Sequence, residues 1–171
     1  GVRGALVALD QATGKEIWRT HTVPVGNEKN ADTWKGDSGK TGGGAAWFIG
    51  SYDPKLNLIY YGTSNPGPWS AIVRGNDSSD VGKFTNLYTA SVVALNPDTG
   101  NIVWHYQFAP NDVWDWDTWE LIQGDVTVNG QRRKVIMHMA RNGFLYVIDR
   151  TNGQLLSAKR MGGGLQASEA D

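Results

Sequence analysis

The sequence predicts an all-β protein that forms part of a β-propeller, and three observations lead to this prediction. A motif of the form A-L-[DN]-x-x-T-G-x-x-x-W recurs, and its copies are separated by about the length of one propeller blade. Glycine accounts for 22 of the 171 residues, roughly twice its usual share, and clusters of Asn, Asp and Gly supply turns. No stretch shows the apolar period of an amphipathic helix, so we expect few helices.

The repeated motif sets the expected number of blades. Four segments align on the residue that opens each turn, which is Asp10, Asp53, Asn96 or Asp149. The spacings between these residues are 43, 43 and 53, close to the period of a four-stranded blade. We therefore expect about four blades, where complete propellers usually have about four to eight.

Two copies of the motif carry a tryptophan at the same offset. Trp18 and Trp104 hold this position, whereas the copy at Asp149 has Ser157 there and the copy at Asp53 is degenerate. A ring repeated at one point of the motif indicates a packing role. We expect both rings to dock between adjacent blades.

Each copy of the motif predicts a β-hairpin, because its Asp or Asn side chain can bond its own backbone and its glycine accepts a positive φ. Strands are expected at residues 5–9, 16–20, 45–52, 57–62, 88–95, 102–107, 125–128, 133–139, 144–148 and 154–157. Asn129-Gly130 predicts a two-residue hairpin turn within the longer third interval. Most of the unusual residues fall in three predicted loops, at residues 24–44, 65–86 and 110–120.

Charge and composition argue against several classes of protein. The 16 Lys and Arg residues nearly balance the 17 Asp and Glu residues, which argues against a nucleic-acid partner or an anionic membrane surface. No apolar run is long enough for a membrane-spanning helix, and without cysteine the chain forms no internal disulfide. Gly39-Lys40-Thr41 resembles the end of a phosphate-binding loop, but Trp34 stands where that loop needs glycine. The chain starts mid-pattern and without Met, so we interpret it as a piece of a longer protein.

A loop rich in acidic residues and tryptophan is the first candidate for chemistry. Residues 112–120 contain four acidic groups and three tryptophans. If this segment is extended, Asp115 and Asp117 lie on one face, where two carboxylates either share a proton or hold a hard cation. The alternative is a solvated acidic loop with tryptophans packed beneath it. These residues alone leave both interpretations open.

Three further features suggest binding, and each also has a plain structural explanation. Asn65 follows a predicted strand and its amide oxygen suits a hard metal, although Asn-Pro-Gly-Pro is also typical of a simple turn. The glycines at residues 42–44, with Ala45, would let a flat ligand approach the backbone. Trp47 would offer a stacking face, although a flexible entry to a strand explains this segment too. Arg141 precedes a strand, and a lone arginine is usually solvated.

Four segments together resemble the quinoprotein alcohol dehydrogenases, the large-subunit methanol and ethanol dehydrogenases that use pyrroloquinoline quinone (PQQ). The segments run from Trp47 to Trp69, from Trp104 to Gln107, from Trp114 to Asp117 and from Arg141 to Arg150. The resemblance implies an eight-bladed propeller with tryptophan-docking motifs, of which residues 1–160 form a partial PQQ-binding domain. Residues 161–171 form a tail that does not resemble the family, and we assign them no function.

The resemblance implies which residues hold the metal and move the proton. Asp115 is similar to the catalytic base of the family. Asn65, Asp115 and Asp117 are similar to its metal ligands, completed by a glutamate that the family places upstream of Gly1. An aspartate at the position of Asp117 marks the lanthanide-using members, whereas calcium enzymes tend to have a small or neutral residue there.

The resemblance also implies the cofactor and substrate contacts. Trp47 corresponds to the tryptophan that stacks on PQQ, and Arg141 to the arginine that bonds a quinone oxygen. Ala45 stands where methanol dehydrogenases have a threonine that contacts PQQ. Trp69 corresponds to a wall of the alcohol pocket. Residues 87–95 are closer to the ethanol-type enzymes.

The implied activity is oxidation of small primary alcohols to aldehydes by hydride transfer to PQQ, with Ca²⁺ or a lanthanide ion as Lewis acid. A cytochrome c acceptor, a bacterial periplasmic location and no nucleic-acid partner are also implied. The oligomeric state stays open, with a homodimer as one option. Part of a propeller leaves strand edges open, so we expect the isolated 171 residues to be inactive and insoluble or molten.

Three alternatives to an ethanol-type dehydrogenase remain at this point. The first is a lanthanide methanol dehydrogenase, and the second is a sugar-oxidising quinoprotein of the same superfamily. The third is a non-catalytic propeller that serves as a binding platform, which would need neither the Trp-Asp-x-Asp loop nor Asn-Pro-x-Pro-Trp.

Overall fold

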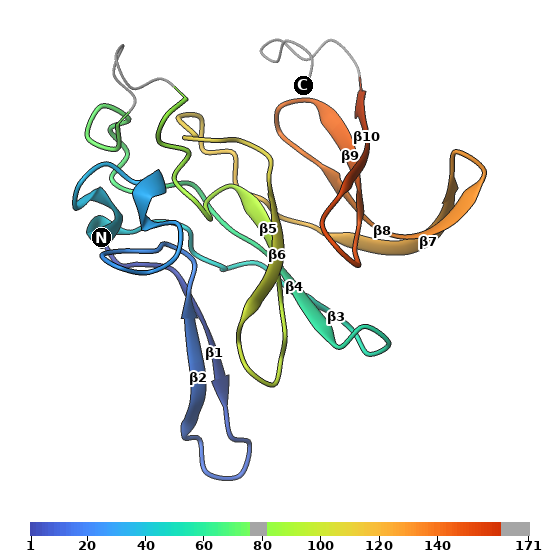
Figure 1. Ribbon diagram of the computed structural model, residues 1–171, viewed down its shortest axis with the longest axis horizontal. Helices are drawn as coiled ribbons and strands as arrows, with labels where there is room; N and C mark the ends of the chain where they lie inside the picture. The colour runs from blue at the N-terminus through green and yellow to red at the C-terminus, as the bar shows by residue number, and fades with distance from the viewer. Residues whose placement is uncertain (76–81, 162–171) are drawn as a thin grey trace.

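The computed structural model describes residues 1–75 and 82–161, which form three antiparallel sheets arranged side by side (Figure 1). The first is a hairpin of β1 (Ala5–Leu9) and β2 (Glu16–His21). The second contains, in order, β3 (Ser51–Asp53), β4 (Leu58–Gly62), β5 (Ser91–Leu95) and β6 (Ile102–Gln107). The third contains, in order, β7 (Ile122–Val128), β8 (Gln131–Met139), β9 (Phe144–Asp149) and β10 (Leu155–Arg160).

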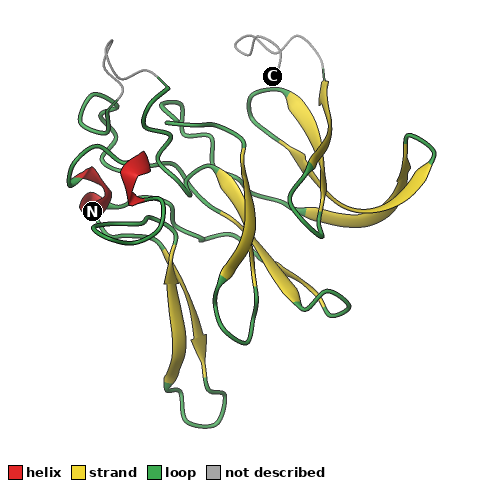
Figure 2. Ribbon diagram, in the orientation of Figure 1, coloured by secondary structure: helices red, strands yellow, loops and turns green. Residues whose placement is uncertain are grey.

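Among the described residues, helical structure is confined to the loop that follows β2. Two short 3₁₀ helices, η1 (Ala31–Thr33) and η2 (Ser38–Thr41), lie there, apart from the strands (Figure 2). Within the described part of the chain, no helix is long and apolar enough to cross a membrane. The tail over residues 161–171 falls outside the described residues except for Met161.

The sheet topology confirms the propeller prediction and corrects the expected number of blades. In each four-stranded sheet sequential strands are neighbours, as in a propeller blade. The β1–β2 hairpin is a separate two-stranded sheet. Residues 1–75 and 82–161 therefore contain two complete blades and one further hairpin, not about four blades.

The difference comes from the motif copy at Asp53. The turns opened by Asp10, Asn96 and Asp149 join β1 to β2, β5 to β6 and β9 to β10, so they close corresponding hairpins of three successive sheets. The turn at Asp53 joins β3 to β4, the first hairpin of the middle sheet. The motif identifies a kind of turn and not which hairpin of a blade the turn closes. The spacing of the copies therefore could not show that the β3–β4 and β5–β6 hairpins belong to one sheet.

Most predicted strands are confirmed to within a few residues, with one clear exception. The sequence predicts a strand over residues 45–52, but only Ser51–Asp53 pairs, as β3 with β4. Residues 45–50 form a loop because their backbone partner lies elsewhere: the Ser64 N–H donates to the Ala45 carbonyl at 3.0 Å. The Asn129-Gly130 turn is confirmed, since both residues have positive φ (50° and 77°).

The core lies between neighbouring sheets. β5 is buried along its whole length because its alternate residues face opposite neighbours. Val93 and Leu95 pack with Leu6 of the β1–β2 hairpin. The other face of β5 belongs to a larger cluster shared with the third sheet, which contains Leu58, Tyr60, Val92, Ala94, Trp104, Phe108, Ile136, Ala140, Phe144, Tyr146 and Ile148.

Each motif tryptophan docks on the turn of the next sheet, as predicted. The Trp18 Nε1–H donates to the Pro97 carbonyl at 2.8 Å, and the ring lies over Gly100, where an added Cβ would be 2.6 Å from it. The Trp104 ring lies over Gly153, 2.7 Å from an added Cβ, but its Nε1–H is buried with no hydrogen-bond partner among the described residues. Glycine is required at both turns because φ is positive (74° and 79°) and because the ring leaves no room for a side chain.

An ion pair also joins the two four-stranded sheets. Arg150 donates through Nε to Asp53 Oδ2 at 2.8 Å and through Nη1 to Asp125 Oδ1 at 2.9 Å. Burial alone would raise the pKa of Asp53, which is 4% exposed. Hydrogen bonds from Arg150 and from two backbone N–H groups outweigh the burial and hold the pKa of Asp53 below its usual value.

Gly100→Ala should lower the free energy of unfolding by about 1–3 kcal/mol more than Gly130→Ala. Both substitutions place alanine at a positive φ and share that cost. Only the Cβ added at Gly100 collides with the Trp18 ring, because nothing lies within 4 Å of a Cβ added at Gly130. Urea unfolding of the two variants, each made in the full-length protein that carries this segment, measures the difference. Equal losses would contradict the docking of the ring on Gly100.

The free energy of unfolding should fall as the pH drops below about 4. The folded-state pKa of Asp53 is lowered, so its stabilisation is complete above the unfolded-state pKa and is lost as the pH falls through the folded-state value. Asp53→Asn should flatten this part of the profile. Asp37→Asn, at an exposed carboxylate, is the control and should keep the profile. If Asp53→Asn showed the same pH dependence of the free energy of unfolding as wild type, the Arg150–Asp53 ion pair would be excluded as the origin of that dependence.

Candidate functional site

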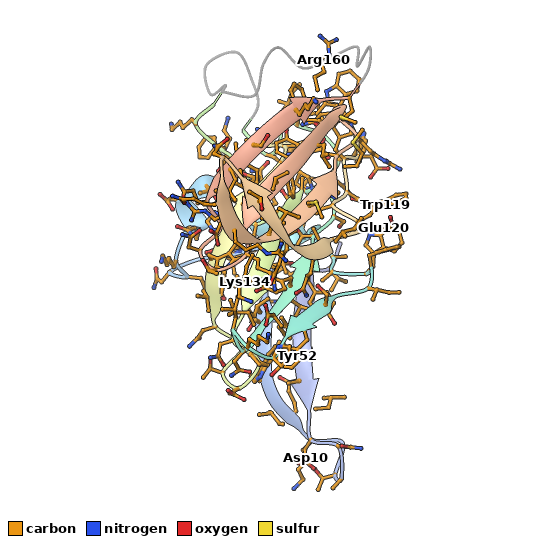
Figure 3. The ribbon with its side chains drawn as sticks, turned by 90° about the vertical axis from the view of Figure 1, so that its right-hand side faces the viewer. Asp10, Tyr52, Trp119, Glu120, Lys134 and Arg160 are labelled. Atoms are coloured by element: carbon orange, nitrogen blue, oxygen red, sulfur yellow. The ribbon has the colours of Figure 1, made fainter. Side chains whose placement is uncertain are left out.

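The residues singled out from the sequence lie in loops at one end of the sheets. Because the strands are antiparallel, the loops after β2, β4, β6 and β8 all emerge at the same end. Trp119 and Glu120 project together from one side of the molecule, away from the Asp10 turn (Figure 3). The motif turns lie at the other end, so the packing motif and the candidate site are separate.

Backbone contacts bring the glycine run against the Asn65 loop. The Gly44 N–H donates to the Asn65 carbonyl at 2.9 Å, and Gly43 forms an antiparallel bridge with Pro66. A Cβ on Gly43 would lie 2.6 Å from the Asn65 carbonyl oxygen. The glycines thus make room for the chain's own backbone, which is one reason for glycine here, and that they also admit a flat ligand stays a prediction. Ala45, the next residue, is exposed.

Asp117 is attached to the Asn65 loop. The Asn65 N–H donates to Asp117 Oδ1 at 2.7 Å, and the Thr118 N–H donates to the Thr63 carbonyl at 3.1 Å. This close approach depends on Gly62, since a Cβ there would collide with the Thr118 carbonyl. Two predicted metal ligands that are distant in sequence, Asn65 and Asp117, are therefore adjacent in space.

The Asp117 carboxyl lies in an environment that disfavours its charged form. Burial raises its pKa, and the negative charge of Asp115 raises it further. The Asn65 N–H and the side chains of Trp47 and Trp119 oppose the rise, but the pKa stays above its usual value. A cation beside Asp115 and Asp117 would favour the charged carboxylate and so offset this rise.

Asp115 lies in an irregular segment. Its φ of +61° is in the left-handed region, so the loop is not extended there and the predicted alternation of side chains does not hold. Arg141 Nη1 donates to the Asp115 carbonyl at 2.6 Å and holds the loop at this point. The Asp115 side chain is exposed, which leaves its carboxylate accessible.

An aromatic cluster connects the predicted cofactor residues. The Arg141 guanidinium lies over the Trp119 ring, 4.5 Å from its centroid, and Trp47 meets Trp119 edge to face at 5.9 Å. The sequence analysis gave Trp119 no role of its own, although it lies in the acidic tryptophan loop. Trp47 is 59% exposed and Trp69 is 56% exposed, so both rings are accessible.

A hollow of about 390 Å³ borders Asp117. Its lining consists of Asp117, Trp119, Glu120, Ile122, His138, Met139 and Arg141. His138 Nδ1 lies 3.0 Å from the Glu120 carbonyl, and burial lowers the pKa of His138 despite this contact. His138 is therefore neutral near pH 7, and it supports the loop that ends in Glu120.

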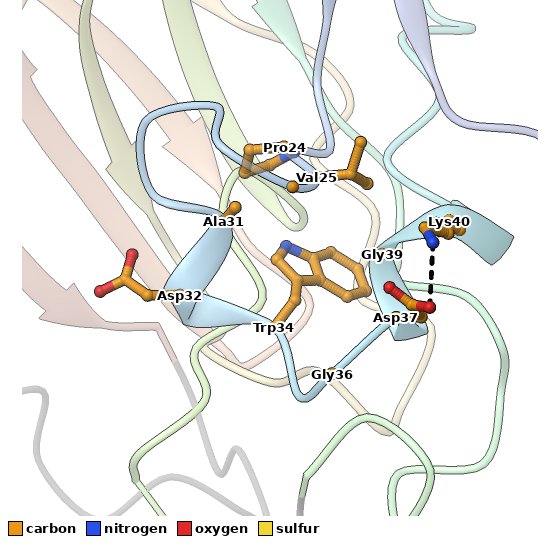
Figure 4. Close-up of a pocket in the computed structure, with 10 residues that line it drawn as sticks. Pro24, Val25, Ala31, Asp32, Trp34, Gly36, Asp37, Gly39 and Lys40 are labelled. Atoms are coloured by element: carbon orange, nitrogen blue, oxygen red, sulfur yellow. Dashed lines mark ion pairs between the residues drawn. The ribbon is translucent and has the colours of Figure 1, made fainter.

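A second hollow, of about 240 Å³, surrounds Trp34 beside the Gly39-Lys40-Thr41 segment (Figure 4). Lys40 Nζ pairs with Asp37 at 2.9 Å. Trp34 is 3% exposed, and its Nε1–H donates to the Leu87 carbonyl at 2.5 Å. Trp34 therefore anchors the loop that carries the glycine run to the segment before β5.

Two buried polar residues that the sequence analysis assigned no function support the Asp115 loop. The Asp112 carboxylate accepts the N–H groups of Trp114 at 2.8 Å and Trp116 at 2.7 Å. Arg74 Nη2 donates to the Asp112 carbonyl at 2.7 Å. The acidic tryptophan loop draws attention to Asp112, but no local pattern distinguishes Arg74 from a solvated loop arginine.

The donors that the site offers are all oxygen atoms. Asn65, Asp115 and Asp117 provide one amide and two carboxylates, the ligands that hard cations prefer. Across residues 1–75 and 82–161 no group of three or more His, Cys, Asp or Glu side chains is arranged to hold a metal. Since Ca²⁺ takes roughly six to eight oxygen ligands, this set would supply only part of a coordination shell.

Comparison with known proteins places the chain among dehydrogenases. The family described as "Glucose/ethanol/alcohol dehydrogenase, beta-propeller domain" matches residues 1–158. Quinohemoprotein alcohol dehydrogenase ADH IIB of Pseudomonas putida is 42% identical, over all of this chain and 26% of that protein. A lanthanide-dependent methanol dehydrogenase of Methylorubrum extorquens is 37% identical, over 94% of this chain and 28% of its own length.

Solved structures agree with this comparison. Quinohemoprotein alcohol dehydrogenase ADHIIG from Pseudomonas putida HK5 superposes with a TM-score of 0.83 at 44% identity, over 94% of this chain and 24% of the other. The chain spans about a quarter of the length of these relatives. With residues 1–158 matched and the sheets arranged as propeller blades, the chain belongs to the PQQ β-propeller family of glucose, ethanol and alcohol dehydrogenases.

Proposed function

We propose that this chain is part of the catalytic propeller of a PQQ-dependent dehydrogenase that oxidises small primary alcohols to aldehydes. The observation that carries the proposal is the hydrogen bond from the Asn65 backbone N–H to Asp117 Oδ1 at 2.7 Å, which brings together two loops with predicted ligands close enough to Asp115 for its charge to act on Asp117. Trp47 and Arg141 come to the same place through Trp119. The relatives named as quinohemoprotein and lanthanide-dependent dehydrogenases support this assignment.

The site residues fit a hard cation and a flat, anionic cofactor. The pKa of Asp117 is raised by burial and, to a smaller extent, by the charge of Asp115, and Ca²⁺ or a lanthanide ion would offset both effects by stabilising the carboxylate. Asn65, Asp115 and Asp117 would hold the ion, Trp47 would stack on PQQ, and Arg141 would donate to it. Ala45 is exposed near this cluster, and Trp69 would border the alcohol.

The chain's own groups would position the alcohol and take its proton. When bound, PQQ supplies the hydride acceptor and the metal supplies Lewis acidity. Asp115 would accept the alcohol proton, because its carboxylate is exposed while its backbone is held by Arg141 at 2.6 Å. The Arg141 charge would favour negative charge on the acceptor. We propose in addition a periplasmic location and a cytochrome c electron acceptor.

Asp115→Asn in the full-length protein that carries this segment should reduce turnover by about 10²–10⁴-fold, the range expected for loss of a general base. PQQ should still bind, because the substitution leaves the Arg141 bond to the residue 115 carbonyl in place. Dye reduction with ethanol, methanol and glucose measures turnover, and PQQ absorbance measures loading. Asp98→Asn, on the distant β5–β6 turn, is the control. Full turnover in Asp115→Asn would refute its role as the base.

Asp117→Asn should reduce lanthanum-dependent turnover by about tenfold or more, and calcium-dependent turnover by less. The amide oxygen can still accept the Asn65 N–H, which now donates to Oδ1 at 2.7 Å, so mainly charge is removed. A trivalent ion loses more attraction than a divalent ion when one negative charge is removed. Apo-protein reconstituted with PQQ and either La³⁺ or Ca²⁺ provides the measurement. Equal losses with the two ions would remove Asp117 from the metal site.

A further inference from the structure

Arg74 is the largest of the fully buried side chains, although it carries a charge. Burial lowers its pKa, and the charge of Asp112 opposes that effect. A buried guanidinium needs hydrogen-bond acceptors for its donors, because an unsatisfied charged group is costly in a protein interior. The acceptors of Arg74 therefore indicate what this side chain holds together.

Four acceptors surround the guanidinium, and they come from two loops, the one between β4 and β5 and the one between β6 and β7. Nε donates to the Pro68 carbonyl at 2.8 Å, and Nη2 donates to the Asp112 carbonyl at 2.7 Å. Nη1 donates to Asn86 Oδ1 and to Asn111 Oδ1, each at 2.6 Å. Pro68 belongs to the loop that carries Asn65 and Trp69, whereas Asn111 and Asp112 begin the loop that carries Asp115 and Asp117.

The two asparagines are held in a specific conformation. Asn86 has φ of 57° and Asn111 has φ of 48°, so both are in the left-handed region. Asn111 turns its amide oxygen to Arg74, and its Nδ2 is buried with no hydrogen-bond partner among the described residues. The orientation of Asn111 is thus set by the guanidinium.

The effect of Arg74 passes along the loop to the site. Arg74 holds the Asp112 carbonyl, and the Asp112 carboxylate in turn binds the N–H groups of Trp114 and Trp116. Asp115 lies between these two anchored residues, with its φ of +61°. The path from Arg74 therefore ends at the carboxylates that the proposed function assigns to the metal and the proton.

We propose that Arg74 is a positioning residue that sets the Asp115–Asp117 loop against the Asn65–Trp69 loop, so that the cation ligands and the alcohol wall meet. This inference rests on the proposed function. A lysine could not replace the arginine, because an ammonium group has three donors for four acceptors and lacks the planar fork. Arg74 touches neither substrate nor cofactor and acts through the backbone of both loops.

The test uses Arg74→Lys and Arg150→Lys in the full-length protein that carries this segment. Arg150 is the matched control because it is also buried, at 7% exposure, and also joins distant segments, but at the Asp53 ion pair rather than at the site. Each protein is reconstituted with PQQ and titrated with Eu³⁺, whose luminescence reports affinity. Melting temperature, and KM and kcat for ethanol, are measured in parallel.

Arg74→Lys should weaken Eu³⁺ binding by about 10–100-fold, the usual loss when a residue that orients metal ligands is changed. It should also raise KM for ethanol, because the loop that carries Trp69 loses its bond at the Pro68 carbonyl. Arg150→Lys should lower the melting temperature while Eu³⁺ affinity stays within about twofold of wild type. Europium affinity of Arg74→Lys within that same range would overturn the proposal and leave Arg74 a structural residue. Wild-type protein that neither binds Eu³⁺ nor oxidises alcohol would instead refute the proposed function.

A second pair of variants applies if Arg74→Lys does not fold. Asn111→Gly removes one acceptor of Arg74 and still permits the left-handed backbone. Asn129→Gly makes the same change at an exposed hairpin position with φ of 50°. Asn111→Gly should weaken Eu³⁺ binding while Asn129→Gly does not. Equal affinities in these two variants would overturn the proposal.

Discussion

The docking of a tryptophan ring on a glycine of the next sheet is the contact on which the arrangement of sheets depends. A four-stranded sheet of this kind is apolar on both faces, as β5 shows by being buried along its whole length. β5 packs on one face against Leu6 of the β1–β2 hairpin and on the other face against the third sheet. Trp18 over Gly100 and Trp104 over Gly153 set the distance and rotation between successive sheets. The Arg150–Asp53 pair adds a polar contact at the same kind of interface.

Once the sheets are placed, antiparallel topology puts the functional loops at one end and the motif turns at the other. The loops are then held mainly by backbone hydrogen bonds. Asn65 is bonded on one side to the glycine run and on the other to Asp117. Gly43 and Gly62 allow these approaches because a side chain at either position would collide with a neighbouring backbone. The site is therefore assembled by segments that have little regular structure of their own.

The electrostatics of the site follow from this assembly. Asp117 is partly buried, and burial raises its pKa, with a smaller contribution from the negative charge of Asp115. Arg141 does not neutralise the pair directly, since it donates to the Asp115 carbonyl and lies over Trp119. The remaining negative charge is what makes the site suited to a cation. Arg74 holds the same loop from behind through neutral acceptors.

Sequence patterns predicted local geometry well and relationships between distant segments poorly. The Asn129-Gly130 turn, the motif hairpins and most strands are confirmed, because each depends on neighbours in the chain. The degenerate copy at Asp53 was counted as a further blade. It is the first hairpin of the middle sheet, because the same kind of turn can close either hairpin of a blade. The glycine run was interpreted either as room for a flat ligand or as a flexible entry to a strand, and neither interpretation indicated that its close neighbours are backbone segments distant in sequence.

The sequence by itself determined the all-β class and the tryptophan docking, because these depend on repeats and turn residues, and its motifs predicted the residues of the candidate site. Only the tertiary structure decided that Asn65 and Asp117 meet, that Asp115 lies in a left-handed conformation, and that Arg74 connects the loops. These features depend on backbone groups of distant segments. Except for proline, which lacks the N–H, every residue type carries the same backbone N–H and C=O groups. The local sequence therefore does not indicate which backbone groups of distant segments will bond to each other.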